Sequence, residues 1–233
     1  MIAELTEFAK VDACNDHLRA AVLSGNGDFF CAGGDLRWMM SQISADRETR
    51  VRESRKLAQM LQAINNMPIP LIGKVQGGAF GGGIGMICVC DVAVAHTETK
   101  FGLTETRLGL IPATIGPYVL ARLGEGVARR VFMSARVFDA HEAVKFGLIA
   151  EACTMDDLDE WIEWQVKPYL SAAPKAVAAA KALAKDLGGR ITEDMIEDSI
   201  QRLADIWEAP EAAQGIDAFF AKTEPRWVFI NKK

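Results

Sequence analysis

The pattern of apolar positions predicts alternating helices and strands over roughly the first two thirds of the chain. Residues 1–10 carry apolar side chains at intervals of three, which is typical of an amphipathic helix. Residues 18–23 form a short apolar run that predicts a strand. Residues 46–66 repeat apolar side chains on one face and predict a long helix that ends before Pro68.

The later elements follow the same alternation until about residue 150. They are apolar strands at 70–75 and 91–95, an extended piece at 100–103, a Gly- and Pro-containing loop at 104–116, helices over 118–132, and an Asp-capped helix followed by a strand at 138–149. From residue 155 onward the pattern is almost wholly helical. We therefore predict an α/β core over residues 1–152 and a helical region over residues 153–233.

A glycine-rich segment, residues 75–86, connects a predicted strand to a predicted helix. Its six glycines within residues 77–85 let the backbone turn with positive φ and leave N–H groups uncovered by side chains. A turn of this kind that leads into a helix collects unpaired donors and the positive end of the helix dipole. Such a point suits a negative charge, either a fixed phosphate or an oxyanion that forms during a reaction.

The spacing of these glycines excludes two common phosphate-binding motifs. A dinucleotide site requires G-x-G-x-x-G with an acidic residue about 20 positions further on, whereas these glycines are contiguous and Asp91 comes too early. No Gly-Lys-Ser/Thr sequence follows, so the segment is not a P-loop. A tight connection between strand and helix, without any ligand, is the alternative for this segment taken by itself.

A second segment of small residues, 28–36, can also expose backbone N–H groups, and Asp35 can cap the helix that begins at Leu36. Two such segments, each following a predicted strand, could direct two N–H groups at one oxygen. A thioester carbonyl needs this arrangement if its oxygen is to gain negative charge as an enolate.

Glu105 is the candidate for moving the proton that such an enolate requires. It ends an apolar stretch, residues 101–105, where burial would raise the pKa of its carboxyl toward the working pH. A carboxyl with such a pKa favours general acid/base catalysis. The alternative is an ion pair between Glu105 and Arg107 at the surface.

Composition narrows the class of protein. The chain has 233 residues, of which 50% are hydrophobic and 24% charged, as in ordinary globular proteins. A formal net charge of −5 without a basic cluster argues against nucleic acid as the main partner. No apolar run approaches the roughly 20 residues of a membrane span, and the amino terminus has no signal-peptide pattern. The five cysteines, an odd number, suggest a reducing compartment, and with three scattered histidines they do not suggest a metal site. We expect a cytoplasmic protein that binds neither nucleic acid nor membrane.

Several segments together resemble the crotonase (enoyl-CoA hydratase/isomerase) family in order and in spacing. They are residues 30–36, 75–83, 91–95, 101–105 with 108–112, 129–134, 143–148 and 215–222. The set is specific, and the resemblance covers essentially the whole chain. It implies an α/β fold built as a spiral of ββα units, with a helical carboxy-terminal region that forms homotrimers or dimers of trimers.

The resemblance also implies roles for individual residues. The backbone N–H groups of Gly34 and Gly82 would form the oxyanion hole, and Glu105 would be the acid/base. The substrate-binding candidates are Ala32, Asp35 and Leu36 for the adenine and pantetheine of CoA, Gly81, Thr104 and Pro112 as further contacts, and Phe219 and Lys222 toward the CoA of a neighbouring subunit. A solvated surface lysine is the alternative for Lys222. CoA is part of the substrate, so no separate cofactor is expected.

The chain departs from the family pattern in two places. Hydratases of the family usually carry two glutamates that hold the attacking water; the second matches Glu105, but the first falls at Gly85. A single carboxylate could shift a double bond, as in the family's isomerases, or support hydration if the substrate or another residue held the water. The chain also begins at the helix after the family's usual first strands, so either its natural start lies upstream or CoA binding is weakened.

Residues 104–118 resemble hydratases of branched glutaconyl-CoA substrates, which belong to leucine or acyclic-terpene breakdown and carry a second carboxylate. Arg107 could meet that carboxylate, or it could be a surface charge. We therefore expect an acyl-CoA hydratase that acts on a 2-enoyl-CoA thioester, with branched glutaconyl-CoA as the candidate. An enoyl-CoA isomerase that uses the same Glu105, and a non-catalytic CoA-binding protein of the same fold, are the alternatives.

Overall fold

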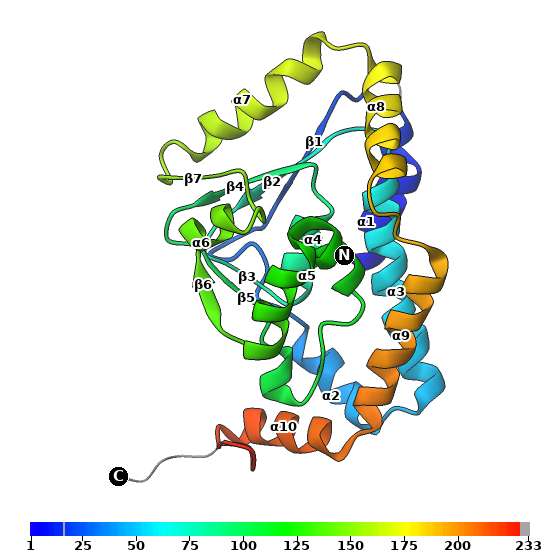
Figure 1. Cartoon of the computed structure of the whole chain (residues 1–233), viewed down its shortest axis with the longest axis vertical. Coiled ribbons are helices and arrows are strands. Elements are labelled where there is room, and N and C mark those ends of the chain that lie inside the picture. The colour runs from blue at the N-terminus through cyan, green and yellow to red at the C-terminus, as the bar shows by residue number, and fades with distance from the viewer. Residues whose placement is uncertain (16, 229–233) are drawn as a thin grey trace.

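A parallel sheet lies at the centre of the fold (Figure 1), in a computed structural model that describes residues 1–15 and 17–228. Its strands, in spatial order, are β1 (Ala21–Ser24), β2 (Leu71–Val75), β4 (Val92–His96) and β7 (Glu151–Cys153). Every neighbouring pair runs parallel, so the carboxyl ends of the strands lie at one edge. Parallel strands of this kind need helices on both faces.

Alternate residues of these strands point to opposite faces and enter different apolar clusters. On one face, Ile72 and Val94 pack with Leu158 and Ile162 of α7 (Leu158–Ser171). On the other, Leu71 and Val75 join the main core. The helices on that side are α1 (Ile2–Lys10), η1 (Asp12–Cys14), α3 (Arg47–Asn66) and α4 (Gly82–Cys88).

A second, smaller sheet contains β3 (Gly78–Phe80), β5 (Lys100–Gly102) and β6 (Val137–Asp139), in that order. The β3–β5 pair is parallel and the β5–β6 pair antiparallel. On its other side, β3 is joined by a parallel bridge between Ala79 and Cys31. This bridge places the two segments of small residues side by side.

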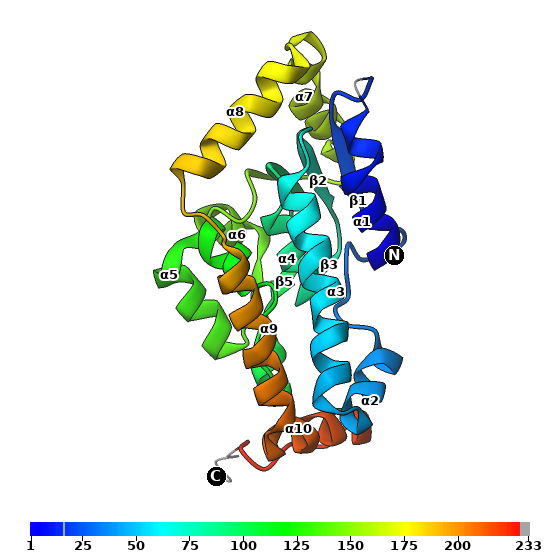
Figure 2. The same ribbon diagram turned by 90° about the vertical axis from the view of Figure 1, so that its right-hand side faces the viewer.

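The remaining elements of the described chain are all helical. They are α2 (Leu36–Ser44), η2 (Glu105–Leu108), α5 (Gly116–Ser134), α6 (Ala140–Lys145), α8 (Pro174–Leu187), α9 (Glu193–Glu208) and α10 (Pro210–Ala221). Figures 1 and 2 show α7 and α8 at one end of the molecule and α2 and α10 at the other.

Helix α9 returns along α3 and ties the end of the chain to the core (Figure 2). Ala58 of α3 packs with Ile196 and Ile200 of α9 in a small buried cluster. Next to it, the guanidinium of Arg55 donates two hydrogen bonds to the Glu197 carboxylate, at 2.5 and 3.0 Å. The predicted helical region is therefore in contact with the core, and its treatment as a separate domain stays a prediction.

The structure agrees with most predicted elements and corrects four details. The strand predicted at 18–23 is shifted to β1, Ala21–Ser24. The glycine-rich segment is not only a turn, because it contains β3, and β6 precedes the Asp139-capped helix α6. The strand predicted within 138–149, after the Asp-capped helix, lies further on as β7, Glu151–Cys153. The break in α5 at Gly124, which has φ 71° and ψ 161°, agrees with the helices predicted over 118–132.

In the part of the chain that the structure describes, no helix has both the length and the hydropathy needed to cross a bilayer. All five cysteines are free thiols.

Gly77 holds the loop before Cys31 against β3, and a side chain there would break this contact. A Cβ on Gly77, where φ is +65°, would lie 1.7 Å from the Asp28 carbonyl oxygen. Gly27 provides a matched control, since its φ is +81° and a Cβ would meet nothing within 4 Å. We expect Gly77→Ala to lower the free energy of unfolding by about 3 kcal/mol or more and Gly27→Ala by about 1–2 kcal/mol. Urea unfolding of both variants measures the difference, and equal losses would contradict the close approach.

Candidate active site

The two segments of small residues are aligned by hydrogen bonds between residues 30–31 and the glycine-rich segment. Phe30 N–H donates to the Gln76 carbonyl at 2.9 Å, and Cys31 N–H to the Gly78 carbonyl at 3.1 Å. Phe80 N–H donates back to the Cys31 carbonyl at 3.0 Å. Gly34 and Gly82 each follow the bridged pair Cys31 and Ala79 by three residues. Because the bridge is parallel, Gly34 and Gly82 therefore follow the same end of the two paired segments.

The backbone N–H groups of Gly34 and Gly82 are free to bind a ligand. Neither donates a hydrogen bond to any residue within 1–15 and 17–228. The N–H of the preceding Gly81, by contrast, is taken by the Gly102 carbonyl at 3.0 Å. Gly81 turns the chain from β3 into α4 with φ 52° and ψ −116°, a conformation that favours glycine. The space at Gly82 is open, because a Cβ there would meet nothing within 4 Å.

Glu105 begins the short 3₁₀ helix η2, directly beyond β5, and its side chain reaches the Gly81 turn. Its Oε1 lies 3.1 Å from the position that a Cβ on Gly81 would take. Its Oε2 is buried and has no hydrogen-bond partner within the described chain. The residue as a whole is half-buried, but its carboxyl end is not exposed, and this burial raises the pKa of Glu105 to about 7.

The alternative of a surface ion pair between Glu105 and Arg107 is wrong. Arg107 is exposed, and the ion pairs of the described residues do not include one between these two side chains. Arg107 also does not line the cavity in which the carboxyl lies.

A cavity of about 280 Å³, which we call the Glu105 cavity, brings most of the predicted residues together. It is lined by Ala32, Gly34, Leu36, Gly81, Gly82, Thr104, Glu105, Pro112 and Phe219 from the predicted set. Glu105 is the only titratable residue among all its lining residues in the described chain. Such a cavity can hold a neutral group beside one proton-moving carboxyl and two backbone donors.

Asp35 and Lys222 lie outside this lining. The Asp35 carboxylate caps α2 by accepting a hydrogen bond from Trp38 N–H at 2.8 Å, as its position in the sequence predicts. Lys222 ends α10 in a left-handed conformation with φ 54° and is exposed. Phe219, one turn earlier, is 49% exposed and lines the cavity where it meets solvent. Contacts of these residues with CoA stay predictions.

Sequence reasoning missed the apolar walls of the cavity. They include Trp38 and Met39 of α2, Leu57 of α3, Ile115 before α5, and Leu203 and Trp207 of α9. Trp38 and Trp207 meet edge to face, with ring centroids 6.4 Å apart. Apolar periodicity predicted buried helix faces that include Leu57, Leu203 and Trp207, whereas Ile115 falls in the predicted loop 104–116. No pattern marked any of these residues as cavity walls.

Position 85, where the family's first glutamate would stand, is filled from a neighbouring element. Gly85 is buried in α4, and a Cβ there would lie 2.4 Å from Cγ2 of Ile115. The Ile115 side chain therefore occupies the space that a side chain at position 85 would need.

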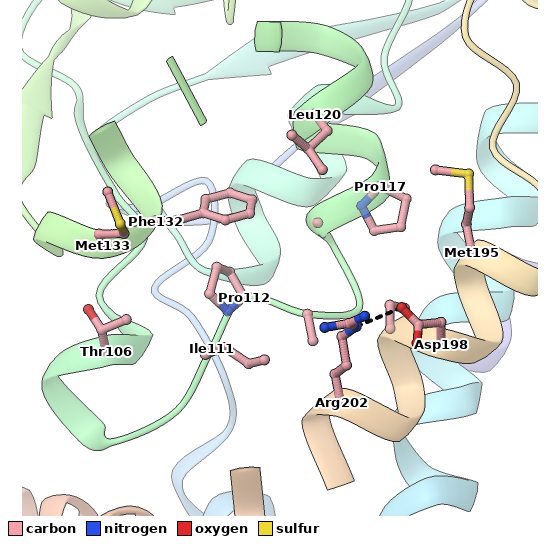
Figure 3. Close-up of a pocket in the computed structure, with 13 residues that line it drawn as sticks. Thr106, Ile111, Pro112, Pro117, Leu120, Phe132, Met133, Met195, Asp198 and Arg202 are labelled. Carbon is pink, nitrogen blue, oxygen red and sulfur yellow. Dashed lines mark hydrogen bonds and ion pairs between the residues drawn. The ribbon is translucent and has the colours of Figure 1, made fainter. Parts of the chain in front are cut away.

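A second hollow, which we call the α5–α9 pocket (Figure 3), shares with the Glu105 cavity a wall formed by Ile111, Pro112 and Ala113. Its volume is about 440 Å³. Its lining is mainly apolar, with Leu120 from α5 and Met195 from α9, and the Arg202–Asp198 ion pair lies on α9 beside it. Because the three wall residues line both hollows, a change in this segment would alter both.

The chain matches the model of the enoyl-CoA hydratase/isomerase family over residues 1–229, and it belongs to this family. Enoyl-CoA hydratase ACTT6 of Alternaria alternata is 30% identical over 210 residues, which cover 88% of this chain and 66% of the relative. The crystal structure of an enoyl-CoA hydratase from Shewanella pealeana is 36% identical, with a TM-score of 0.77 and coverage of 97% and 85%. Pseudomonas aeruginosa AtuE is 34% identical, with a TM-score of 0.77 and coverage of 97% and 88%. These structures confirm the predicted crotonase-like fold.

The raised pKa of Glu105 makes the free energy of unfolding depend on pH. Between pH 4.5 and about 7 the buried carboxyl keeps its proton, whereas the unfolded chain has lost it. The folded state then binds more protons, so the free energy of unfolding falls as pH rises through this window. We expect the wild type to lose up to about 3 kcal/mol relative to Glu105→Gln, with no further loss at higher pH. Urea unfolding of both proteins across the window measures this, and parallel pH dependences would contradict the burial.

Proposed function

We propose that this protein is an acyl-CoA hydratase, which adds water across the double bond of a 2-enoyl-CoA thioester. One observation carries the proposal: a buried carboxyl without a hydrogen-bond partner lies in the same cavity as two glycines whose N–H groups have no acceptor within the described chain. The enoyl-CoA hydratases among the similar proteins support the same reaction class.

In the proposed reaction Glu105 acts first as a general base and then as a general acid. Its carboxylate takes a proton from water, and the hydroxide oxygen forms a bond to the β-carbon of the enoyl group. The electron pair of the double bond moves toward the thioester, whose oxygen becomes an enolate held by the N–H groups of Gly34 and Gly82. The protonated Glu105 then returns the proton to the α-carbon, which completes the addition of one water and restores the carboxylate.

The CoA part of the substrate is proposed to bind where the cavity opens to solvent. Ala32 and Leu36 line this side of the cavity together with the half-exposed Phe219. Asp35 caps α2, and in this proposal the exposed Lys222 neutralises a phosphate of CoA. In this proposal Gly81, Thr104 and Pro112 contact the thioester end.

For the acyl group we propose a branched glutaconyl chain, on the resemblance of residues 104–118 to hydratases of such substrates. The apolar walls suit the branched part, because Trp38, Trp207 and Leu203 offer no charge. The second carboxylate would need a cation from outside the lining, since Glu105 is its only titratable member in the described residues and Arg107 does not line the cavity. Turnover of glutaconyl, branched and unbranched enoyl-CoAs, followed by mass spectrometry, tests this choice.

An isomerase is the second candidate, and the packing at Gly85 favours it. With Ile115 against Gly85, Glu105 is the only carboxyl that faces the cavity in the described chain. In that reaction Glu105 would take a proton from C2 of a 3-enoyl-CoA and return it to C4, without water. Absorbance of the conjugated enoyl thioester separates the two, because hydration removes this band and isomerisation creates it. Binding without turnover of either substrate would favour a non-catalytic CoA-binding protein.

We further propose a homotrimer or a dimer of trimers. None of the 14 residues of α8 is fully buried within the described chain, although a helix of this length is marginal in water without packing. Trp164 and Leu170 of α7, and Leu183 and Leu187 of α8, are exposed apolar side chains. Apolar surface of this kind marks contact with another protein.

We expect Glu105→Gln to lower kcat for water addition by about 10²- to 10⁴-fold, because it removes the group that moves the proton. Binding of CoA should persist, since the amide fills the same space. Glu125→Gln, at an exposed position on α5, is the matched control and should keep full activity. Stopped-flow absorbance gives the rate and calorimetry the affinity; full activity of Glu105→Gln would remove this residue from the reaction.

The proposed oligomeric state can be tested by measuring the mass of the protein in solution. Light scattering after size-exclusion chromatography should give a mass of three or six times the 25.4 kDa of one chain. Replacing Leu183 and Leu187 of α8 by Glu should lower this mass, because charges would enter the apolar contact. A wild-type protein that elutes as a 25.4 kDa monomer would contradict the proposal.

A further inference from the structure

The contact between Gly85 and Ile115 leaves no room for any side chain at position 85. A Cβ on Gly85 would lie 2.4 Å from Cγ2 of Ile115 and 2.9 Å from its Cβ. Leu61 Cδ1 would follow at 3.7 Å, which is ordinary contact. The obstruction therefore comes from Ile115 alone, and it includes the part of the side chain closest to the backbone.

Ile115 cannot easily move away. It is 2% exposed and stands at the N-cap of α5, where its carbonyl accepts hydrogen bonds from Tyr118 N–H at 3.1 Å and Val119 N–H at 3.0 Å. Its side chain is β-branched, so few rotamers are open to it. Relief of the contact would require a shift of the backbone at the start of α5.

The same side chain forms part of the wall of the Glu105 cavity. One side of Ile115 thus faces α4 at Gly85, and another faces the space in which the acyl group is proposed to react. The other lining residues of the described chain are apolar, glycine or threonine, apart from Glu105. No second acid or base shares the cavity within this part of the protein.

We propose that Ile115 is a specificity-determining residue: by filling the space beside Gly85, it restricts the cavity to one proton-moving carboxyl, Glu105. The role of Glu105 in this statement rests on the function proposed above. Gly85 and Ile115 act as a matched pair, so that a carboxyl can enter at 85 only if position 115 loses its whole side chain. Alanine at 115 would not suffice, because the Cβ atoms of residues 85 and 115 would still be 2.9 Å apart.

The test compares Gly85→Glu in three backgrounds, with Ile, Ala or Gly at position 115. Gly126→Glu is the control for adding a carboxyl to a glycine of a helix, since a Cβ at Gly126 meets nothing within 4 Å. We expect Gly85→Glu alone to lower Tm by roughly 5–10 °C, the usual size of an overpacking effect in a chain of this length. Gly126→Glu should change Tm by less than about 2 °C.

The first part of the proposal, that Ile115 blocks a side chain at position 85, is tested by whether the effects of the two substitutions on Tm are additive. Each substitution at 115 is also made alone, so that its own effect on Tm is known. In the Ile115→Gly background, Gly85→Glu should lower Tm by much less than it does in the wild type. In the Ile115→Ala background, the loss of Tm should lie between these two values. Additive effects, or a Gly85→Glu protein as stable as the wild type, would overturn the proposal.

The second part of the proposal, that the cavity holds one carboxyl, is tested by the number of carboxyls that titrate in it. This measurement does not require the enzyme to turn over a substrate. ¹³C NMR of labelled glutamate carboxyls should show Glu105 titrating as a single group in the wild type. In Gly85→Glu/Ile115→Gly it should titrate in two steps, because two carboxyls in one cavity are coupled. A Glu105 titration that is the same in both proteins would overturn the proposal.

Turnover separates this proposal from the function on which it rests. If the wild type converts no enoyl-CoA while the Tm coupling and the two-step titration are found, the proposed function fails and the role of Ile115 in excluding a second carboxyl stands. If the wild type is active and depends on Glu105, but Tm effects are additive, the function stands and the proposal about Ile115 fails.

Discussion

The pairing of residues 30–31 with strand β3 is the constraint on which the site depends. The hydrogen bonds from Phe30 and Cys31 to the glycine-rich segment, and the return bond from Phe80, fix the register of two segments that lie almost 50 residues apart in sequence. A slip of one residue would change the position of Gly34 relative to Gly82, and with it the relative position of their N–H groups. The close approach at Gly77 holds the same register, because it admits no side chain between the two segments.

The second requirement is electrostatic and opposes stability. Burial of the Glu105 carboxyl beside Gly81 leaves Oε2 without a partner in the described chain and keeps the proton on the group up to about pH 7. An unpaired buried polar atom lowers stability, and this kind of local cost is characteristic of functional sites. The apolar walls from α2, α3 and α9 maintain the burial, so helices from early and late in the chain together enclose the Glu105 carboxyl.

Local patterns in the sequence predicted most helices and strands, because periodicity records which face of each element is buried. Strand β3 was missed because its residues lie in a run whose glycines indicate a turn, and its pairing with β5 and Cys31 is tertiary. The glycines and Glu105 could be found because their residue types carry the chemistry. Ile115, Trp38 and Trp207 could not, because apolar residues become cavity walls only when α2, α5 and α9 come together. The resemblance located Gly85 as a departure, and only the structure connects it with Ile115.

The central claim is that the N–H groups of Gly34 and Gly82 act together on one thioester oxygen. Difference infrared spectroscopy can observe this directly, with an enoyl-CoA carrying ¹³C at the thioester carbonyl and bound to Glu105→Gln so that it is not consumed. Two hydrogen bonds to the oxygen weaken the C=O bond, so the account predicts a carbonyl stretch at lower frequency in the complex than in water. A bound substrate whose carbonyl stretch stays at its value in water would contradict the account.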